Sequence, residues 1–180
     1  PVYGPETESI TACTVPLSGG ECFELLGETF RVIDVPGHTA GHIAYAMEGA
    51  LFCGDTLFAG GCGRLFEGTP AQMLTSLNKL AALPDDTLVY CAHEYTEANL
   101  RFAAAVEPAN AQIQERCAAV TQRRQHAEAT VPSRLGEERE TNPFLRARQP
   151  AVIAAARARG CHSDDELAVF TTIREWKNGF

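Results

Sequence analysis

The chain has 180 residues and carries 15 Lys and Arg against 23 Asp and Glu, a formal net charge of −8. Because nucleic-acid affinity comes from clustered basic residues, this balance argues against a nucleic-acid partner, and an anionic ligand would need a local basic pocket. Hydrophobic residues make up 45% of the chain, enough for a buried core, and no apolar run is long enough to span a bilayer. The seven cysteines are scattered, odd in number and without a Cys-x-x-Cys pair, which predicts a reduced, cytoplasmic protein.

The first half of the chain is predicted to form strands around one helix. Short apolar or alternating runs bounded by Gly, Asp and Glu are typical of strands, and they occur at residues 22–26, 29–35, 42–47, 50–53 and 87–95. Thr69 to Gln72 has the pattern of a capping box with Pro70 at the first helical position, so we expect a helix there. Its apolar residues share one helical face and are expected to pack in the core.

The second half is predicted to be helical. Helical periodicity covers residues 98–106 and 110–128, Pro150 opens an Ala-rich helix, and Ser163 to Glu166 resembles a capping box at the start of a final helix. The Glu- and Arg-rich segment 130–143 is interpreted as a polar connector on the solvated surface. Strands followed by helices indicate an α+β protein with two units, residues 1–95 and 96–180.

Three residues are candidate metal ligands. His38, Asp55 and His93 each follow a strand-like run, and strand ends can converge at one edge of a layered fold. Imidazole and carboxylate suit Zn, Fe or Mn, and a metal with an open position makes a nucleophilic water available at neutral pH. A single histidine is more often structural, so only the combination of the three residues with their surrounding motifs indicates a metal site. The remaining histidines are expected to be a hydrogen-bonding neighbour of the site (His42) and surface residues (His126, His162).

The order of the motifs around these residues resembles one enzyme family. Gly37-His38-Thr39-Ala40-Gly41-His42, Gly54-Asp55-Thr56-Leu57-Phe58, residues 60–69, His93-Glu94-Tyr95 and Thr141-Asn142-Pro143-Phe144 together look like glyoxalase II, the hydroxyacylglutathione hydrolase of the metallo-β-lactamase superfamily, in its bacterial form. The resemblance implies a metallo-β-lactamase αββα sandwich followed by a small all-α domain. That family places a His-x-His-x-Asp-His motif upstream of these segments, and this sequence has none. We therefore expect an N-terminally truncated protein.

The resemblance also implies a reaction and a site. It implies hydrolysis of the thioester S-D-lactoylglutathione to D-lactate and glutathione, the second step of methylglyoxal detoxification, by a monomer that binds two divalent ions, zinc first and iron or manganese as alternatives. With the upstream motif present, which the activity would require, His38 would bind one ion, His93 the other, and Asp55, the catalytic residue, would bridge them. Arg64, Tyr95, Arg174 and Lys177 would bind the glutathione part, and Phe66 stands where other members have a tyrosine.

Alternatives remain open at this stage. Arg174 and Lys177 lie three residues apart on one helix face, where they could simply complement the helix dipole. Cys62, in the Gly-rich loop, could help to position the site. A mononuclear iron persulfide dioxygenase would share the His and Asp scaffold but should lack the helical unit. A chain without the upstream ligands could also be a non-catalytic fragment or a module that binds glutathione conjugates.

Overall fold

The computed structural model describes residues 1–180 and contains ten strands and six α-helices. The strands are β1 (Tyr3–Pro5), β2 (Val15–Leu17), β3 (Cys22–Leu25), β4 (Glu28–Asp34), β5 (Ile43–Met47), β6 (Ala50–Gly54), β7 (Leu57–Phe58), β8 (Gly61–Cys62), β9 (Leu88–Cys91) and β10 (Ser133–Arg134). The helices are α1 (Pro70–Ala81), α2 (Thr96–Val106), α3 (Ala111–Gln125), α4 (Leu135–Thr141), α5 (Pro150–Arg157) and α6 (Glu166–Asn178), with a short 3₁₀ helix at Pro143–Leu145. The expected strands and helices are therefore present.

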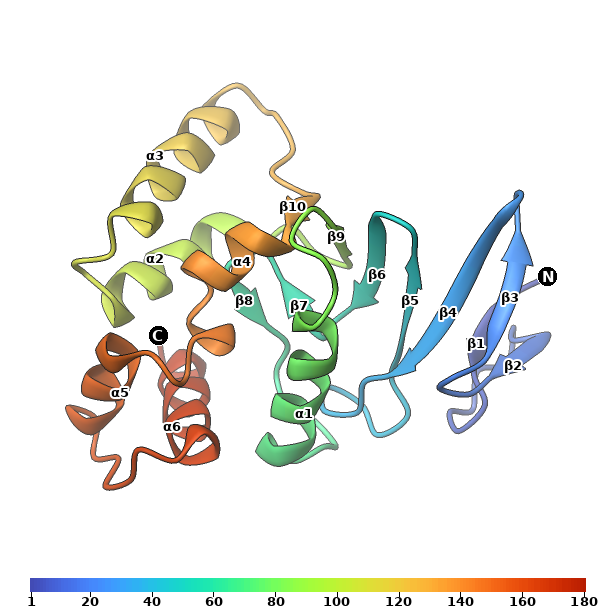
Figure 1. The fold of residues 1–180 in the computed structure, drawn as a ribbon, viewed down its shortest axis with the longest axis horizontal. Helices are drawn as coiled ribbons and strands as arrows, with labels where there is room; N and C mark the ends of the chain where they lie inside the picture. Colours follow the sequence, from blue (N-terminus) through green and yellow to red (C-terminus); the bar gives the residue numbers. More distant parts are fainter.

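One mixed sheet organises the strand-rich half. Its six strands lie in the order β10-β9-β6-β5-β4-β3, with β6 and β9 parallel and all other neighbours antiparallel. Strands β1 and β2 form a separate pair, and β7 and β8 form a short hairpin. Figure 1 shows the strands at the N-terminal end of the molecule and α2, α3, α5 and α6 at the other, with the β7–β8 hairpin between them.

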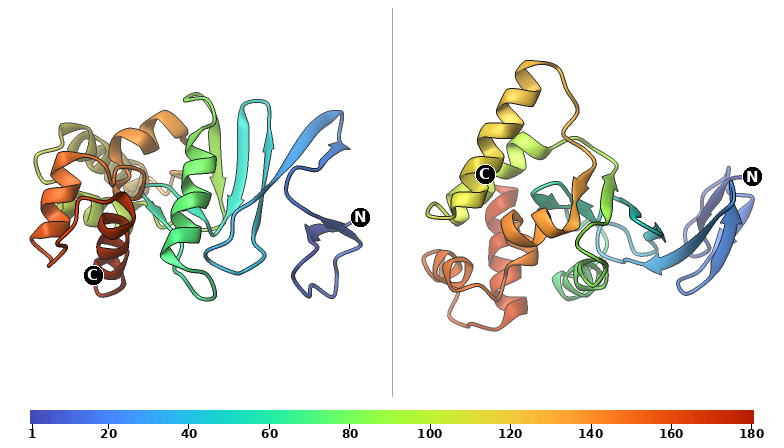
Figure 2. Two further views of the ribbon diagram at one scale, coloured as in Figure 1. Left: turned by 60° about the horizontal axis from the view of Figure 1, so that its bottom comes forward. Right: turned by 45° about the horizontal axis from the view of Figure 1, so that its top comes forward.

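Helix α1 covers one face of the sheet because its apolar residues share one side. Thr69 caps the helix: its hydroxyl accepts from the Gln72 backbone N–H, and the Gln72 side chain accepts from the Thr69 N–H, so the predicted capping box is confirmed. Met73, Leu77 and Leu80 are fully buried in a core of 24 residues that also includes sheet residues and apolar residues of the C-terminal helices, such as Phe144 and Phe170. The two halves of the chain thus share one core, and Figure 2 shows α1 between the strands and the C-terminal helices.

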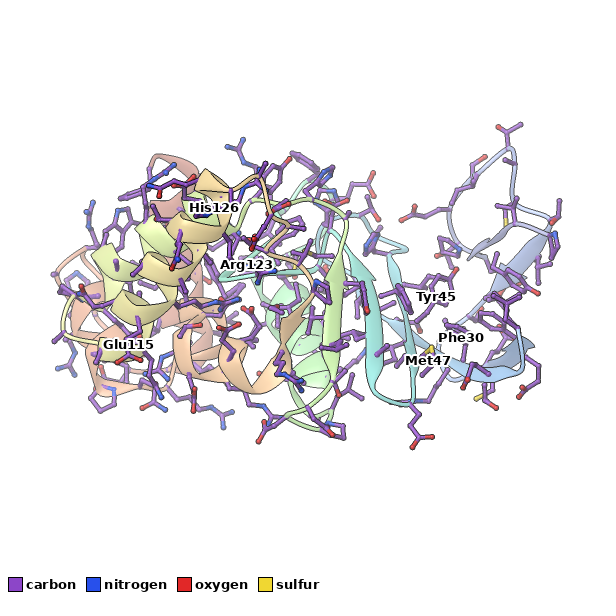
Figure 3. The ribbon with its side chains drawn as sticks, turned by 90° about the horizontal axis from the view of Figure 1, so that it is seen from above. Phe30, Tyr45, Met47, Glu115, Arg123 and His126 are labelled. Carbon is purple, nitrogen blue, oxygen red and sulfur yellow. The ribbon has the colours of Figure 1, made fainter.

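The opposite face of the sheet is covered only in part. A row of neighbouring aromatic rings crosses it from Tyr3 through Phe23, Phe30 and Phe52 to Tyr90, with centroid separations between 4.5 and 6.3 Å. Strands β1 and β2 pack over the Tyr3 end, where Leu17 is buried, whereas Phe52 and Tyr90 are each 38% exposed. In Figure 3, Phe30, Tyr45 and Met47 lie together at this end of the molecule, away from Glu115, Arg123 and His126 on α3.

The segment 130–143 is not the solvated connector that its composition predicts. Ser133–Arg134 within it form β10, which pairs with β9 at the edge of the sheet, and α4 follows directly. Glu138, Thr141 and Asn142 are at most 1% exposed. The prediction was wrong because the partners of these polar side chains come from distant parts of the chain, which a local count of charges cannot reveal.

The start of the last helix also differs from the expectation. The cap is Asp165, whose carboxylate accepts from the N–H groups of Leu167 and Ala168, and not Ser163. The Ser163 hydroxyl instead accepts from the N–H of Asp165, the residue before the helix begins. None of the helices has the length and apolar character needed to cross a lipid bilayer.

We predict that Leu77→Ala, in the middle of α1, lowers the free energy of unfolding by about 2–5 kcal/mol, because a fully buried side chain leaves a cavity between helix and sheet. Urea denaturation provides the measurement. Thr75→Ala, on the exposed side of the same helix, is the control and should change stability by about 0.5 kcal/mol or less. Equal losses in both variants would contradict the packing described.

Candidate active site

The three residues predicted as metal ligands converge in space. His38 lies in the loop after β4, Asp55 directly follows β6, and His93 follows β9. The Nε2 atom of His93 is 3.3 Å from Oδ1 of Asp55, and the Nε2 atom of His38 is 4.0 Å from the other oxygen, Oδ2. The two imidazoles therefore face opposite oxygens of one carboxylate.

A backbone carbonyl sets the orientation of His38. Its Nδ1 is 3.0 Å from the carbonyl oxygen of Arg64. Since a carbonyl can only accept, Nδ1 carries the proton, and the lone pair of the neutral ring lies on Nε2, which faces Asp55. The carboxylate of Glu67 also accepts from the Ala40 N–H, so the segment after β8 holds the His38 loop at two points.

His42 holds the backbone of Asp55. The Asp55 N–H donates to His42 Nε2 over 3.2 Å, and burial lowers the pKa of His42, which favours the neutral ring that can accept this bond. The ring occupies the space beside Gly54, where an added Cβ would lie 2.5 Å from Nε2. Gly54 also has a positive φ of 52°, so the position before Asp55 suits glycine on both counts. His42 is thus a hydrogen-bonding neighbour of the site, as expected.

The donor set fits a shared, carboxylate-bridged metal site. No group of three or more His, Cys, Asp or Glu side chains is arranged to hold one ion. Each oxygen of Asp55 nevertheless faces a different imidazole, so the three side chains present their metal-binding atoms to one another. From this chain each ion would receive one histidine and one carboxylate oxygen, fewer than the three protein ligands of a typical catalytic zinc site.

A cleft of about 530 Å³ opens beside these residues. Asp55 is the only acidic residue in its lining, whereas Arg64, Arg174 and Lys177 contribute positive charge. The acidic protein therefore has the local basic pocket that an anionic ligand requires.

The two basic residues of α6 occupy different environments. Lys177 is half-buried over the rings of Phe102 and Phe180 and donates to the Ala98 carbonyl. Burial, and next the charge of Arg174, lowers its pKa to about 8. Arg174 is only 4% exposed and donates through Nη1 to the Cys62 carbonyl, 3.0 Å away, and through Nη2 to Asn178. Its charge contributes to the cleft, but its hydrogen bonds are to the protein itself.

The remaining predicted residues lie at the rim or in the wall of the cleft. Tyr95 stacks on the His93 ring at 5.1 Å and is half exposed, and Phe66 lies 4.9 Å from the His38 ring and is largely exposed. Cys62 is buried in the wall, and burial raises the pKa of its thiol. His126 and His162 are exposed and distant from the cleft lining, as expected.

The fold places the chain in a broad class of metal-dependent proteins. Residues 3–93 match the family model described as the metallo-beta-lactamase superfamily. The structure aligns with ETHE1 from Myxococcus xanthus at a TM-score of 0.62 and 24% identity, covering 97% of this chain and 56% of that one. A metallo-beta-lactamase from Staphylococcus aureus aligns at a TM-score of 0.56 and 18% identity, over 96% of this chain and 48% of that one. These likenesses confirm the expected α+β fold, and the superfamily implies divalent-metal binding.

Relatives define the family more narrowly. Residues 94–180 match the model described as hydroxyacylglutathione hydrolase C-terminus. Hydroxyacylglutathione hydrolases of Alkalilimnicola ehrlichii and Dechloromonas aromatica are 58% and 54% identical, each over 99% of this chain and over 71% and 73% of their own length. The chain belongs to the hydroxyacylglutathione hydrolase family, an enzyme family, as its motifs predict.

A set of buried polar residues in and behind the wall of the cleft was not predicted from the sequence. The side chains of Asn99, Glu138 and Asn142 are at least 94% buried and hydrogen-bond to the β7–β8 hairpin. The Thr141-Asn142-Pro143-Phe144 motif was the one available signal, and it was used only for the resemblance.

We predict that Gly54→Ala weakens zinc binding by about tenfold or more, since the new methyl group displaces His42 and frees the Asp55 backbone. Isothermal titration with Zn²⁺ measures the change. Gly49→Ala is the matched control: Gly49 also has a positive φ, 72°, but nothing lies within 4 Å of an added Cβ. It should lose a similar amount of stability and keep its zinc affinity, and an equal loss of affinity in both would contradict the role of His42.

Proposed function

We propose that the protein hydrolyses the thioester bond of S-(2-hydroxyacyl)glutathione, with S-D-lactoylglutathione as the substrate that yields D-lactate and glutathione. The observation that carries this proposal is the position of Asp55 between the imidazoles of His38 and His93, in a cleft otherwise lined by basic and neutral residues. Relatives that span the whole chain are named hydroxyacylglutathione hydrolases, which favours this activity over a module that only binds glutathione conjugates.

We infer distinct roles for the residues around the cleft. His38, Asp55 and His93 would hold the metal ions, which in such sites polarise a carbonyl and lower the pKa of bound water. Lys177 and Arg64 offer positive charge to the carboxylates of the glutathione part, and Arg174 strengthens this field from its buried position. The ring of Tyr95 stacks on His93 and can order that ligand while its exposed edge meets the peptide. The thiolate leaving group needs no general acid.

Further assignments complete the proposal. Zinc is the metal that the two neutral imidazoles and the carboxylate suit first, with iron or manganese as substitutes. The matched segments 3–93 and 94–180 support a division into a metal-binding unit, residues 1–95, and a helical glutathione-binding unit, residues 96–180. We place the protein in the cytoplasm as a monomer, without a nucleic-acid or membrane partner.

We predict that Asp55→Ala lowers kcat/KM for S-D-lactoylglutathione by about a hundredfold or more, because both ions lose their shared ligand. Release of glutathione, followed with a thiol reagent, measures turnover, and metal analysis should show a parallel loss of bound ions. The matched control is Asp86→Ala, at an exposed position in the turn before β9, which should retain turnover. Normal turnover in Asp55→Ala would rule out the assignment.

Lys177 gives the proposed site a pH dependence. Its pKa of about 8 means that the side chain is charged below that pH and loses its charge above it. After burial, the nearby charges of Arg174, Arg101 and Arg64 contribute to this lowered pKa. We therefore predict that KM for the substrate rises as the pH increases through about 8. Lys177→Met should raise KM about tenfold at pH 7 and abolish the rise in KM near pH 8.

Lys79→Met is the control for that experiment. Lys79 lies on α1, outside the cleft lining, and donates to the Asp34 carbonyl. It should leave KM and its pH dependence unchanged. A wild-type KM in Lys177→Met at every pH would show that the ligand does not meet this residue.

A further inference from the structure

Most side-chain hydrogen bonds to the β7–β8 hairpin come from the helical half, and the Cys53 thiol of β6 adds one to the Leu57 carbonyl. Residues 56–63 are all buried, so their backbone polar groups need partners inside the protein. Asn142 Nδ2 donates to the carbonyls of Phe58 and Gly61, at 3.2 and 2.9 Å, and Asn99 Nδ2 donates to that of Ala59, at 3.1 Å. Two more bonds complete the set: the Gly60 N–H donates to Glu138 Oε2 at 2.8 Å, and Arg174 Nη1 donates to the Cys62 carbonyl at 3.0 Å.

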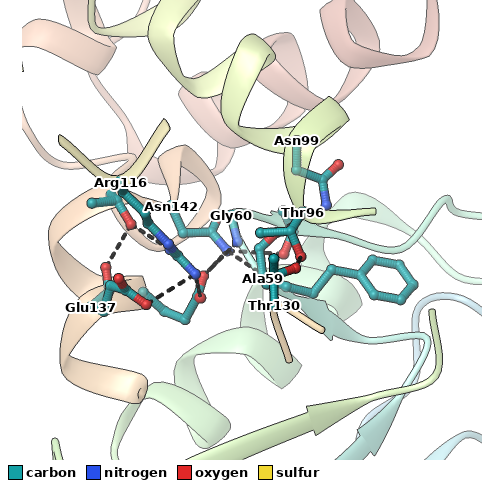
Figure 4. A network of polar contacts seen from close by, with 12 residues as sticks. Ala59, Gly60, Thr96, Asn99, Arg116, Thr130, Glu137 and Asn142 are labelled. Atoms are coloured by element: carbon teal, nitrogen blue, oxygen red, sulfur yellow. Dashed lines mark hydrogen bonds and ion pairs between the residues drawn. The ribbon is translucent and has the colours of Figure 1, made fainter. Parts of the chain in front are cut away.

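These side chains are themselves fixed by a buried polar network. Arg116, from α3, pairs with Glu138 at 2.5 Å and donates to the Thr141 hydroxyl at 2.6 Å. Asn142 Nδ2 lies 3.1 Å from the second oxygen of Glu138. Figure 4 shows Arg116, Glu137 and Asn142 grouped on one side of Gly60, with Asn99 on the other. Since a buried charge is stable only when paired and hydrogen-bonded, Arg116 orients the Glu138 carboxylate toward the hairpin.

The hairpin leads directly into the metal-ligand loops. Gly63, the next residue, donates to the Thr56 carbonyl and packs so closely on the Asp55 carbonyl that an added Cβ would collide with it. Arg64 then supplies the carbonyl that accepts from His38 Nδ1. A shift of the hairpin would therefore move the Asp55 backbone. It would also break the hydrogen bond between His38 Nδ1 and the Arg64 carbonyl, which keeps the proton on Nδ1 and the Nε2 lone pair facing Asp55.

We infer that Asn99, Glu138, Asn142 and Arg174 are positioning residues, through which the helical half sets the geometry of His38 and Asp55 by way of residues 58–64. The inference rests on the proposed metal site and assigns the helical half a second task besides binding glutathione. It also changes the role of Arg174. Arg174 is buried and bonds to the hairpin and to α6, whereas Lys177 is only half-buried and donates to the Ala98 carbonyl of α2, without a bond to the hairpin.

The test compares two pairs of variants in the full protein. Arg174→Met removes the bond to Cys62, and Lys177→Met, on the same helix face, removes charge from the same cleft. Asn142→Asp keeps the size of the side chain and the oxygen that accepts from the Phe144 N–H, but replaces the donor to Phe58 and Gly61 by an oxygen. Thr141→Val disrupts the same buried network without touching the hairpin.

Three readouts separate positioning from substrate contact. The first is the ¹⁵N spectrum of His38 in metal-free protein, which reports whether Nδ1 alone carries the proton. The second is the affinity for Zn²⁺ by titration, and the third is the division of the effect between kcat and KM. We expect Arg174→Met and Asn142→Asp to populate both His38 tautomers, to weaken zinc binding at least tenfold and to lower kcat. Lys177→Met and Thr141→Val should keep the wild-type tautomer and zinc affinity.

Two results would overturn the inference. Arg174→Met with wild-type tautomer and zinc affinity but a raised KM would make Arg174 a substrate contact. Equal loss of zinc affinity in Thr141→Val and Asn142→Asp would show that the network contributes only to the general stability of the protein. If Arg174→Met does not fold, Asn99→Ala, which removes one hairpin bond, provides the milder comparison. Because the first two readouts need no turnover, a protein that binds zinc as described but does not cleave the thioester would refute the proposed reaction and leave this inference standing.

Discussion

The buried backbone of the β7–β8 hairpin is the constraint on which the rest of the site depends. A two-stranded hairpin of this size cannot satisfy its own polar groups, and no other strand of the sheet pairs with it. Its carbonyl and N–H groups are instead paired with amide, carboxylate and guanidinium side chains from the helical half. Because a buried polar group without a partner costs about 1–3 kcal/mol, these contacts fix where the hairpin can lie. Gly63 and Arg64, which follow the hairpin, contact Asp55 and His38, so the place of the hairpin determines where these two residues lie.

The same arrangement explains how an acidic protein can attract an anionic ligand. Most acidic side chains lie on the surface or in ion pairs, such as Glu107 with Arg146. At the cleft the balance is reversed, since the only carboxylate in its wall is the one placed between two imidazoles. Metal ions bound there would neutralise that carboxylate and leave the cleft positive. Burial, and next the neighbouring cations, lowers the pKa of Lys177 in this cleft.

Local signals in the sequence predicted much of the fold. Alternation in β4, the capping box at Thr69 and the apolar face of α1 each act within a few residues, so the chain shows them directly. The site was predicted from the resemblance carried by the motifs around His38, Asp55 and His93, because strand ends alone do not say which of them meet. The geometry brings the three together, and their roles as ligands remain a proposal.

The parts that could not be predicted depend on long-range pairing. Glu138 belongs to a run of charged residues that normally lies in solvent, and its burial follows only from Arg116, 22 positions earlier, and from Gly60, 78 positions earlier. Arg174 shared a helix face with Lys177 in the sequence and was given the same role. Its partner in the fold is a carbonyl 112 residues away, which no periodicity indicates.

Anomalous diffraction from crystals of the zinc-loaded protein, recorded at the zinc absorption edge, tests the central claim most directly. The account predicts zinc signal at Asp55, with the imidazoles of His38 and His93 as the other ligands from this chain. A single peak that does not touch Asp55, or zinc bound at the cysteines instead, would contradict it.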